Sequence, residues 1–306
     1  MAWVRVTGLL ASALVCIAAQ GGTPAVDIDT YWEYGDPAGS EQRFRAALAD
    51  ASGDTQLELL TQIARTYSLR RCFADAHAVL NEVEPKLPAA GAAPRVRYLL
   101  ERGRTFNSAG EKARAKPLFI EAYDLALAAK LDGLAVDAAH MVPIVATDAE
   151  AALWTERGLA LARTSTDRKA RALLPALLNN HAWNLQDSGR HAEALPVFRE
   201  AEAAWHATGR QPQGRIATWS VARCLRSLGR FDEALALQRG LERAFAEIGA
   251  PDGYVFEEIA ELLLATDRRA ESRPYFERAA SALGRDPAFA KEQAARLQRL
   301  RELARD

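Results

Sequence analysis

A two-helix pattern that recurs about every 39 residues constrains the fold of this 306-residue chain more than any other feature. In one copy, Leu60, Ile63, Ala64 and Tyr67 have the i, i+3, i+4, i+7 spacing that places apolar side chains on one face of a helix. A second apolar helix follows after a break near Arg71. The small residues at the matching position of successive second helices are Ala76, Ala115, Ala151, Ala194, Ala234 and Ser272, which lie 39, 36, 43, 40 and 38 residues apart. Such self-similarity is typical of a solenoid, in which helical hairpins bury their apolar faces against one another.

These residues also carry a family resemblance. A large, a small and an aromatic residue on the first helix, followed by Ala-x3-Phe-x2-Ala on the second, resemble the tetratricopeptide repeat. The copies at Leu60–Val83, Leu99–Ala122 and Leu178–Ala201 match best, and the resemblance covers roughly residues 55–284. The period is longer than the usual 34 residues, and Leu80, Thr155 and Gln238 replace the aromatic residue of the second helix in three copies. Repeats of this length resemble those of bacterial regulators and scaffolds.

A HEAT-like array, with units of about 40–47 residues, is the alternative fold. The glycines at positions 110, 189 and 229 favour the tetratricopeptide interpretation, because they fall at the tight turn inside a hairpin. The resemblance therefore implies an all-α fold. We expect a right-handed superhelical solenoid of about six antiparallel helix-turn-helix repeats, with capping helices at both ends.

The N-terminal residues differ in composition from the rest of the chain. Arg5 precedes an uncharged apolar stretch from Val6 to Ala19, which is too short for an ordinary membrane-spanning helix and fits the core of a signal peptide. We therefore predict a signal peptide over residues 1–20, a lead-in segment over 21–39 and the repeat domain over 40–306. This implies a periplasmic or secreted protein, and the alternative is a cytoplasmic protein with a wrongly assigned start.

Both ends of the repeat domain carry candidate capping segments. Ser40 is a candidate N-cap for an opening helix that carries Phe44, and the aromatic lead-in around Trp32 is expected to cover the edge of the first repeat. After Pro287, the residues Phe289, Leu297, Leu300 and Leu303 are expected to lie along one face of a closing helix that is rich in Arg and Glu. A polar-backed cap of this kind keeps the end of a solenoid soluble.

The sequence offers little support for an enzyme. Gly-Lys-Ser/Thr and Gly-x-Ser-x-Gly motifs are absent, and three cysteines are too few for a disulfide framework. Asp137 and His140 share a helix face at i, i+3, but two ligands do not complete a metal site. We therefore predict no catalytic residue, no metal and no cofactor. The 39 basic and 40 acidic residues give a net charge of −1, which argues against nucleic acid as a partner.

The resemblance implies that the first helices line a concave groove. It also implies that the residue after the small residue of each first helix, such as Ala64, points into this groove. Those residues are Arg65, Arg104, His140, Trp183, Arg223 and Glu261, and one turn earlier lie Asn179, Trp219 and Glu257. Together with Asn180 they form the predicted binding surface, because Arg, Trp and Asn suit an extended peptide. Two other interpretations stay open. The two tryptophans can be packing residues, and Arg223 and Arg226 can simply neutralise the nearby glutamates.

Three functions follow from this pattern. The leading one is a non-enzymatic adaptor or scaffold that binds a segment of another protein or a peptide in the groove. The alternative is a sensor of the same fold, in which a peptide or small ligand changes the curvature of the solenoid. The third is a metal-dependent enzyme that uses Asp137, His140 and acidic groove residues. No further segment reaches transmembrane length, so we expect no integral membrane segment once the signal is removed.

Overall fold

The computed structural model describes residues 27–305, and the predicted signal peptide lies outside this range. Within it there are helices and turns but no β-strand. The elements are η1 (Ile28–Tyr31), α1 (Pro37–Leu48), α2 (Gly53–Leu69), α3 (Phe73–Val83), η2 (Glu84–Ala89), α4 (Ala92–Ser108), α5 (Lys112–Ala128), α6 (Asp132–Val145), α7 (Asp148–Thr164), α8 (Arg168–Asp187), α9 (His191–Ala207), α10 (Gln211–Ser227), α11 (Phe231–Glu247), α12 (Gly253–Ala265), α13 (Arg269–Leu283), α14 (Pro287–Glu292) and α15 (Ala294–Arg305).

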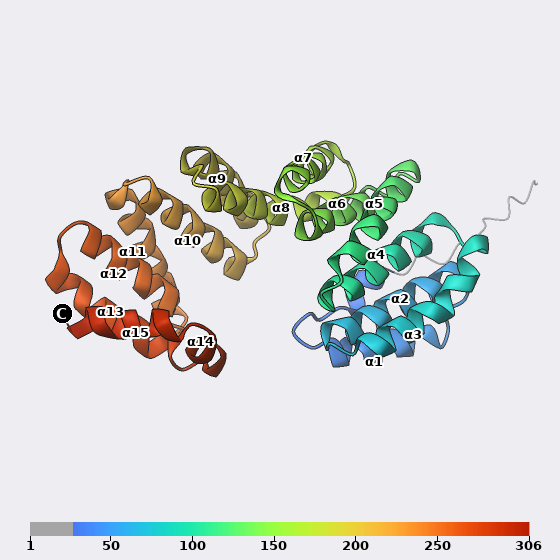
Figure 1. Cartoon of the computed structure of the whole chain (residues 1–306), viewed down its shortest axis with the longest axis horizontal. Helices are drawn as coiled ribbons and strands as arrows, with labels where there is room; N and C mark the ends of the chain where they lie inside the picture. Colours follow the sequence, from blue (N-terminus) through green and yellow to red (C-terminus); the bar gives the residue numbers. More distant parts are fainter. Residues whose placement is uncertain (1–26, 306) are drawn as a thin grey trace, which may run out of the picture.

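The helices pair into six antiparallel hairpins, from α2–α3 to α12–α13, and α1 and α15 pack on the two ends. The hairpins follow one another along an arc, with α5, α7 and α9 on its outer rim and α6, α8 and α10 closer to its inner side (Figure 1). The expected all-α solenoid of six helix-turn-helix repeats with a cap at each end is therefore confirmed.

The repeat register taken from the small residues is also confirmed. At the start of each second helix, the N–H of the small residue donates to the carbonyl of the residue four positions earlier, from Ala76 to Cys72 in α3 through Ser272 to Arg268 in α13. Five of the six small residues are buried, and Ala151 is half-buried. The interval of 43 residues between Ala151 and Ala194 spans α8, which at 20 residues is the longest helix of the array.

The turns inside the hairpins explain three of the glycines. Gly110, Gly189 and Gly229 have φ of 89°, 74° and 73°, a region that L-residues rarely adopt. In the first hairpin, Arg71 takes the same role with φ of 63°. Gly103 is required for a different reason, because a Cβ at this position would lie 2.5 Å from the Phe119 ring. The close approach of α4 and α5 therefore depends on the absence of a side chain there.

The opening helix begins four residues earlier than the sequence predicted. Its N-cap is Asp36, whose Oδ1 accepts the N–H of Gly39 at 2.9 Å, and Pro37 occupies the first helical position. Ser40, the predicted cap, is buried inside the helix and its hydroxyl donates to the carbonyl of Glu33 at 3.0 Å. The prediction for Ser40 was wrong because an Asp-Pro pair just upstream supplies a stronger start signal.

The lead-in segment covers the edge of the first hairpin, as predicted. Trp32 packs edge-on against Phe44 at 5.1 Å between ring centroids, and its indole N–H donates to Gln62 Oε1 at 2.9 Å. At the other end, the single predicted closing helix is two helices, α14 and α15, separated at Gln293. Phe289 of α14 and Leu297 and Leu300 of α15 are nevertheless buried, so the capping role stands.

Candidate partner-binding groove

The inner face of the solenoid is built by the six first helices, α2, α4, α6, α8, α10 and α12. Each carries one of the residues predicted to follow the small position: Arg65, Arg104, His140, Trp183, Arg223 and Glu261. All six are half-buried by the neighbouring helices. They differ in what they contact, and those contacts divide the face into three parts.

The first part, on α2, α4 and α6, is a row of ion pairs that we call the charged row: Arg65, Glu101, Arg104 and Asp137. The Glu101 carboxylate accepts from Arg65 Nη1 at 3.3 Å and from Arg104 Nη1 at 2.7 Å, and Arg104 Nη2 donates to Asp137 at 2.5 Å. The Glu101 side chain is only 3% exposed. Arg65 also lies over the rings of Trp32 and Tyr34 in the lead-in segment. These two arginines therefore bind residues of their own chain.

The basic and acidic side chains of this row stabilise one another's charged forms. Burial alone would raise the pKa of Asp137, but the guanidinium groups of Arg104 and Arg65 outweigh it and hold that pKa below its usual value. The carboxylates in turn keep the pKa of Arg104 above its usual range despite burial. Asp137 is thus ionised, and its charge is already paired with Arg104. Among residues 27–305, no three His, Cys, Asp or Glu side chains are grouped so that they could hold a metal ion.

The last part of the face, on α12, is also paired within the chain. Glu257 accepts from Arg296 of α15 at 2.7 Å, and Glu261 pairs with Arg299 of the same helix. Glu257 and Glu261 lie at i, i+4, where like charges repel, and the arginines of the closing helix offset that repulsion. Arg223 and Arg226 neutralise a different carboxylate, that of Glu258, at 3.2 Å and 2.8 Å. The charged side chains at both ends of the inner face are therefore neutralised by contacts within the chain.

One rule describes the pairing between successive first helices. Each first helix also carries a small residue, such as Ala64 in α2 and Gly103 in α4. The residue that follows it pairs with an acidic residue two positions before the small residue of the next first helix. The pairs are Arg65–Glu101, Arg104–Asp137 and Arg223–Glu258. At the two central junctions the corresponding residues are His140 with Asn180 and Trp183 with Ser220. Neither of these pairs can form a salt bridge, so polar and aromatic groups take the place of ion pairs in the middle of the inner face.

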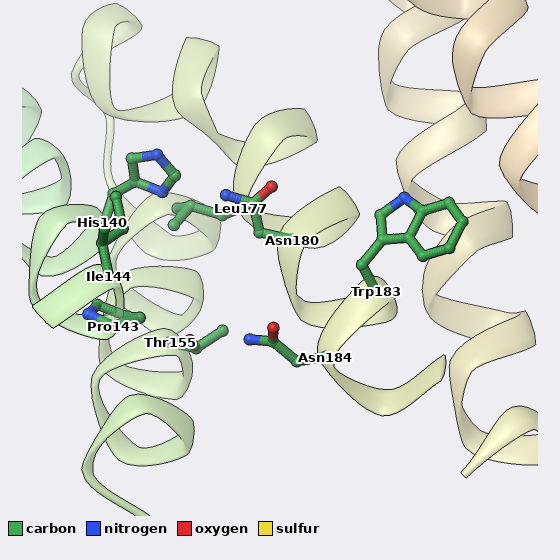
Figure 2. Close-up of a pocket in the computed structure, with 8 residues that line it drawn as sticks. All are labelled: His140, Pro143, Ile144, Thr155, Leu177, Asn180, Trp183 and Asn184. Atoms are coloured by element: carbon green, nitrogen blue, oxygen red, sulfur yellow. The ribbon is translucent and has the colours of Figure 1, made fainter. Parts of the chain in front are cut away.

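A pocket of about 210 Å³ lies at the first of these junctions, between α6, α7 and α8. It is lined by His140, Pro143, Ile144, Thr155, Leu177, Asn180, Trp183 and Asn184. Figure 2 shows the amides of Asn180 and Asn184 on the side of α8 that faces α6 and α7, and the Trp183 indole on the side that faces α10. Asn180 and Asn184 are exposed and lie one helical turn apart, so each can donate and accept toward an extended backbone.

His140 closes one wall of this pocket. Burial lowers the pKa of its imidazole, and the nearby Arg104 adds to that effect while Asp137 opposes it. The ring is therefore neutral at pH 7, which leaves one nitrogen as a donor and the other as an acceptor. The pocket thus presents neutral hydrogen-bonding groups next to apolar surface.

Aromatic side chains continue the inner face beyond the pocket in a row that we call the aromatic ladder: Trp183, Trp219, Tyr254 and Phe289. Neighbouring ring centroids are 6.2, 6.5 and 6.0 Å apart, and the last two contacts are edge-to-face. The indole N–H of Trp219 donates to the carbonyl of Tyr254 at 3.3 Å, which fixes its orientation. Trp183 also packs on Phe198, so both tryptophans combine a packing role with exposed edges.

The structure thus brings together part of the predicted surface. Asn180 and His140 line the central pocket with Trp183, which also contacts Trp219, whereas Arg65, Arg104, Glu257 and Glu261 lie in ion pairs toward the ends. Asn179 is half-buried on α8 and does not line the pocket. Sequence reasoning missed Asn184, although it follows Asn180 by four residues on the same helix face. It also missed the aromatic residue at 254, which a search for aromatics recurring once per hairpin would have found.

Comparison with known proteins supports the helical-repeat assignment. The family model for the tetratrico peptide repeat matches residues 96–206 and 175–272, which together make up more than half of the chain. No curated protein matches the chain. No helix within residues 27–305 has the length and apolar character needed to cross a membrane.

Several solved structures have a similar fold. The apo form of RapI has a TM-score of 0.72 at 12% identity, over 91% of this chain and 81% of that chain. A STAND protein with a tetratricopeptide repeat sensor from Pyrococcus horikoshii has a TM-score of 0.69 at 9% identity, over 88% of this chain and 42% of that chain. The apo quorum sensor NprR from B. thuringiensis has a TM-score of 0.57 at 11% identity, over 89% and 78% of the two chains. At these identities the likeness concerns the fold.

Proposed function

Because the chain belongs to the tetratricopeptide repeat family, we propose that it is a non-enzymatic adaptor that holds an extended segment of a partner protein or peptide on its inner face. The observation that carries the proposal is the interruption of the ion pairs at the two central junctions. There the amides of Asn180 and Asn184 face a pocket that Trp183 also lines, while the corresponding charged side chains at the other junctions are paired. Amides bind peptide backbone, and indole rings supply rigid apolar contact area.

The net charge and the paired arginines also favour a protein or peptide over nucleic acid. A nucleic-acid groove needs a row of unpaired cations along the backbone path, and here the inner-face residues Arg65, Arg104 and Arg223 each contact a carboxylate.

Affinity capture with an Asn180→Ala/Asn184→Ala double variant tests this proposal. Both side chains are exposed, so their removal leaves the core intact, and the loss of their hydrogen bonds should reduce capture of the partner roughly tenfold or more. Asn179→Ala is the matched control, because this residue lies on the same helix but does not line the pocket. Equal capture by the wild type and the double variant would contradict the proposal.

A sensor is the second candidate, and the same central junctions favour it. Ion pairs join α2 to α4, α4 to α6 and α10 to α12, but nothing equivalent joins α6 to α8 or α8 to α10 at these positions. A ligand bound there would contact two groups of hairpins at once and change the curvature between them. Two proteins of similar fold are a quorum sensor and a protein with a tetratricopeptide repeat sensor. A change in radius of gyration on binding, measured by small-angle scattering, would favour sensing over passive scaffolding.

We also propose export to the periplasm or the exterior, on the basis of the apolar stretch Val6–Ala19. The intact mass of the native protein tests this, since removal of a signal peptide would leave a mature chain that starts near residue 21. A native mass that retains Met1 would contradict export and favour the cytoplasmic alternative.

A further inference from the structure

A second cavity, of about 370 Å³, lies beside the aromatic ladder and away from the central pocket. It is formed where α10 begins, α11 ends and α12 begins, and it is lined by Arg215, Ile216, Trp219, Phe245, Asp252, Tyr254 and Val255. Its volume is at the lower end of the range for small-ligand sites, so it suits one large side chain better than a cofactor.

The walls of this cavity are apolar and partly uncovered. Phe245 and Val255 form the walls on α11 and α12, while Ile216 is 60% exposed and Tyr254 is 41% exposed. Single exposed apolar residues are common on proteins, but here two of them border the same cavity as an indole ring. The apolar contact area therefore favours a bulky aliphatic or aromatic side chain as the occupant.

Arg215 gives the cavity a charge preference. Its guanidinium lies over the Phe245 ring at 5.1 Å from the centroid, and its Nε is buried without a hydrogen-bond partner. Within residues 27–305, no carboxylate oxygen lies within 4.0 Å of the Arg215 guanidinium. Asp252 also lines the cavity, but its Oδ1 caps α12 by accepting the N–H groups of Tyr254 and Val255 at 2.9 and 3.0 Å. A carboxylate that enters from a partner would therefore meet an unpaired arginine.

The cavity is continuous with the surface assigned to the partner, because Trp219 and Tyr254 belong to both. Neighbouring ladder rings are 6.2 and 6.5 Å apart, and an extended chain rises about 3.3 Å per residue, so each ladder step corresponds to roughly two residues. A segment that follows the ladder can thus turn alternate side chains toward the rings and place one of them in the cavity.

We propose that this cavity is an anchor site for one bulky apolar side chain of an extended partner segment, with an acidic side chain next to it that pairs with Arg215. This inference rests on the proposed function and adds to it the class of segment that the groove selects. The shape and the apolar walls select the anchor residue, and Arg215 selects the acidic neighbour.

Retention of an end-blocked nonapeptide library, with single positions fixed in turn, tests the anchor on the full chain. The wild type should enrich peptides in which Phe, Leu or Ile lies within two positions of Asp or Glu. Ile216→Arg places a charge at the mouth without disturbing the core, and it should reduce retention of these peptides roughly tenfold to a hundredfold. Arg215→Gln should remove only the acidic preference, a change of about twofold to fivefold, and Arg215→Lys should restore it.

Ile248→Arg is the matched control, since Ile248 is 55% exposed in the turn after α11 and does not line the cavity. The anchor is wrong if the wild type shows no apolar enrichment, or if Ile216→Arg and Ile248→Arg lower retention equally. The Asn180→Ala/Asn184→Ala variant separates the two proposals. If it loses binding while Ile216→Arg keeps it, the groove function stands and the anchor fails. If only Ile216→Arg loses binding, the anchor stands and the central pocket is not the main site.

Discussion

The first three and the last three hairpins line the inner face with different kinds of side chain. On α2, α4 and α6 the charged row joins successive helices, with Glu101 shared by Arg65 and Arg104. From α8 onward, one such pair between first helices remains, Arg223–Glu258, and the aromatic ladder runs beside it, with Trp219 half-buried and Tyr254 41% exposed. A repeat fold thus allows the junctions of the first three hairpins to carry ion pairs while the two central junctions carry polar and aromatic side chains.

The two chemistries have different energetic consequences. A buried ion pair adds little stability over an apolar pair of the same volume, but it is costly to break, so the charged row specifies how α2, α4 and α6 are positioned. Aromatic contacts need no exact charge partner and contribute about 0.5–1.5 kcal/mol per pair beyond their area burial. The charged row should therefore be sensitive to single substitutions, whereas the ladder should tolerate them in the folded state and show their effect in binding.

Breaking the charged row should give the largest effect. Glu101→Gln removes the carboxylate shared by Arg65 and Arg104 and leaves two largely buried guanidinium groups without it. We expect the free energy of unfolding to fall by about 3–5 kcal/mol, as measured by urea denaturation. Glu193→Gln removes an exposed carboxylate that pairs with Arg190 at i, i+3, and it should cause no measurable change. Equal stability of the two variants would show that the charged row is not a structural tie.

A substitution in the last three hairpins should instead raise the free energy of unfolding. Gln238 of α11 is fully buried at a position where four other hairpins have Leu80, Phe119, Phe198 or Phe276. Neither amide atom has a hydrogen-bond partner within residues 27–305. Because an unsatisfied buried amide costs about 1–3 kcal/mol, Gln238→Leu should raise the free energy of unfolding by about 1–2 kcal/mol. Gln186→Leu is the control, since it also removes a real hydrogen bond to Ser227 at 2.8 Å and should not stabilise the protein. A destabilised Gln238→Leu protein would point to an undetected partner of the amide.

The sequence predicted the architecture well because a repeat imposes the same local pattern six times. The small residues such as Ala76 and the turn glycines such as Gly110 recur in successive copies, so each copy supports the pattern seen in the others. The capping segments at the two ends are not repeated and had no such support. The predicted helix cap at Ser40 and the single closing helix through Gln293 were wrong. The choice between Ser40 and Asp36 as the helix cap depends on local geometry that no repeat reveals.

The binding surface was harder to predict than the fold. The register predicts that Arg65, Arg104 and Glu261 point to the inner face, but it does not reveal that each pairs with a carboxylate or a guanidinium from a helix over 30 residues away. Such pairing depends on the spacing between neighbouring helices. In the structure the pairing follows one rule, and the first of the two junctions that depart from it holds the central pocket.

Loss of the ion pairs of the lead-in segment should change the free energy of unfolding less than either of the two substitutions above. Lys169, at the start of α8, donates to Asp27 at 2.8 Å and to Asp29 at 2.6 Å, so the chain ahead of α1 reaches across the first three hairpins to the fourth. These groups are nearly half exposed, and Lys169→Met should lower the free energy of unfolding by less than about 1 kcal/mol. The difference should vanish in about 1 M salt, where the Debye length is near 3 Å. A loss that persists at high salt would mean that packing, not charge, holds the segment.

The smallest expected effect concerns His140, which lies at the boundary between the two halves. It depends on whether the imidazole takes up one proton. His140 occupies the position of Arg65 and Arg104, yet burial lowers its pKa below the ordinary value near 6.5. A base with a lowered pKa in the folded state binds its proton more readily when unfolded. Its contribution to stability is therefore complete above pH 6.5 and is lost as the pH falls through the folded pKa. His140→Gln cannot take up this proton, so the melting temperature of the wild type should fall relative to that of the variant between pH 7 and pH 5. His77 and His181, whose pKa values are also lowered by burial, are present in both proteins and cancel in the difference. A difference that is constant with pH, or that grows in favour of the wild type on acidification, would mean that Asp137 controls this imidazole and that the charged row extends one helix further than the ion pairs indicate.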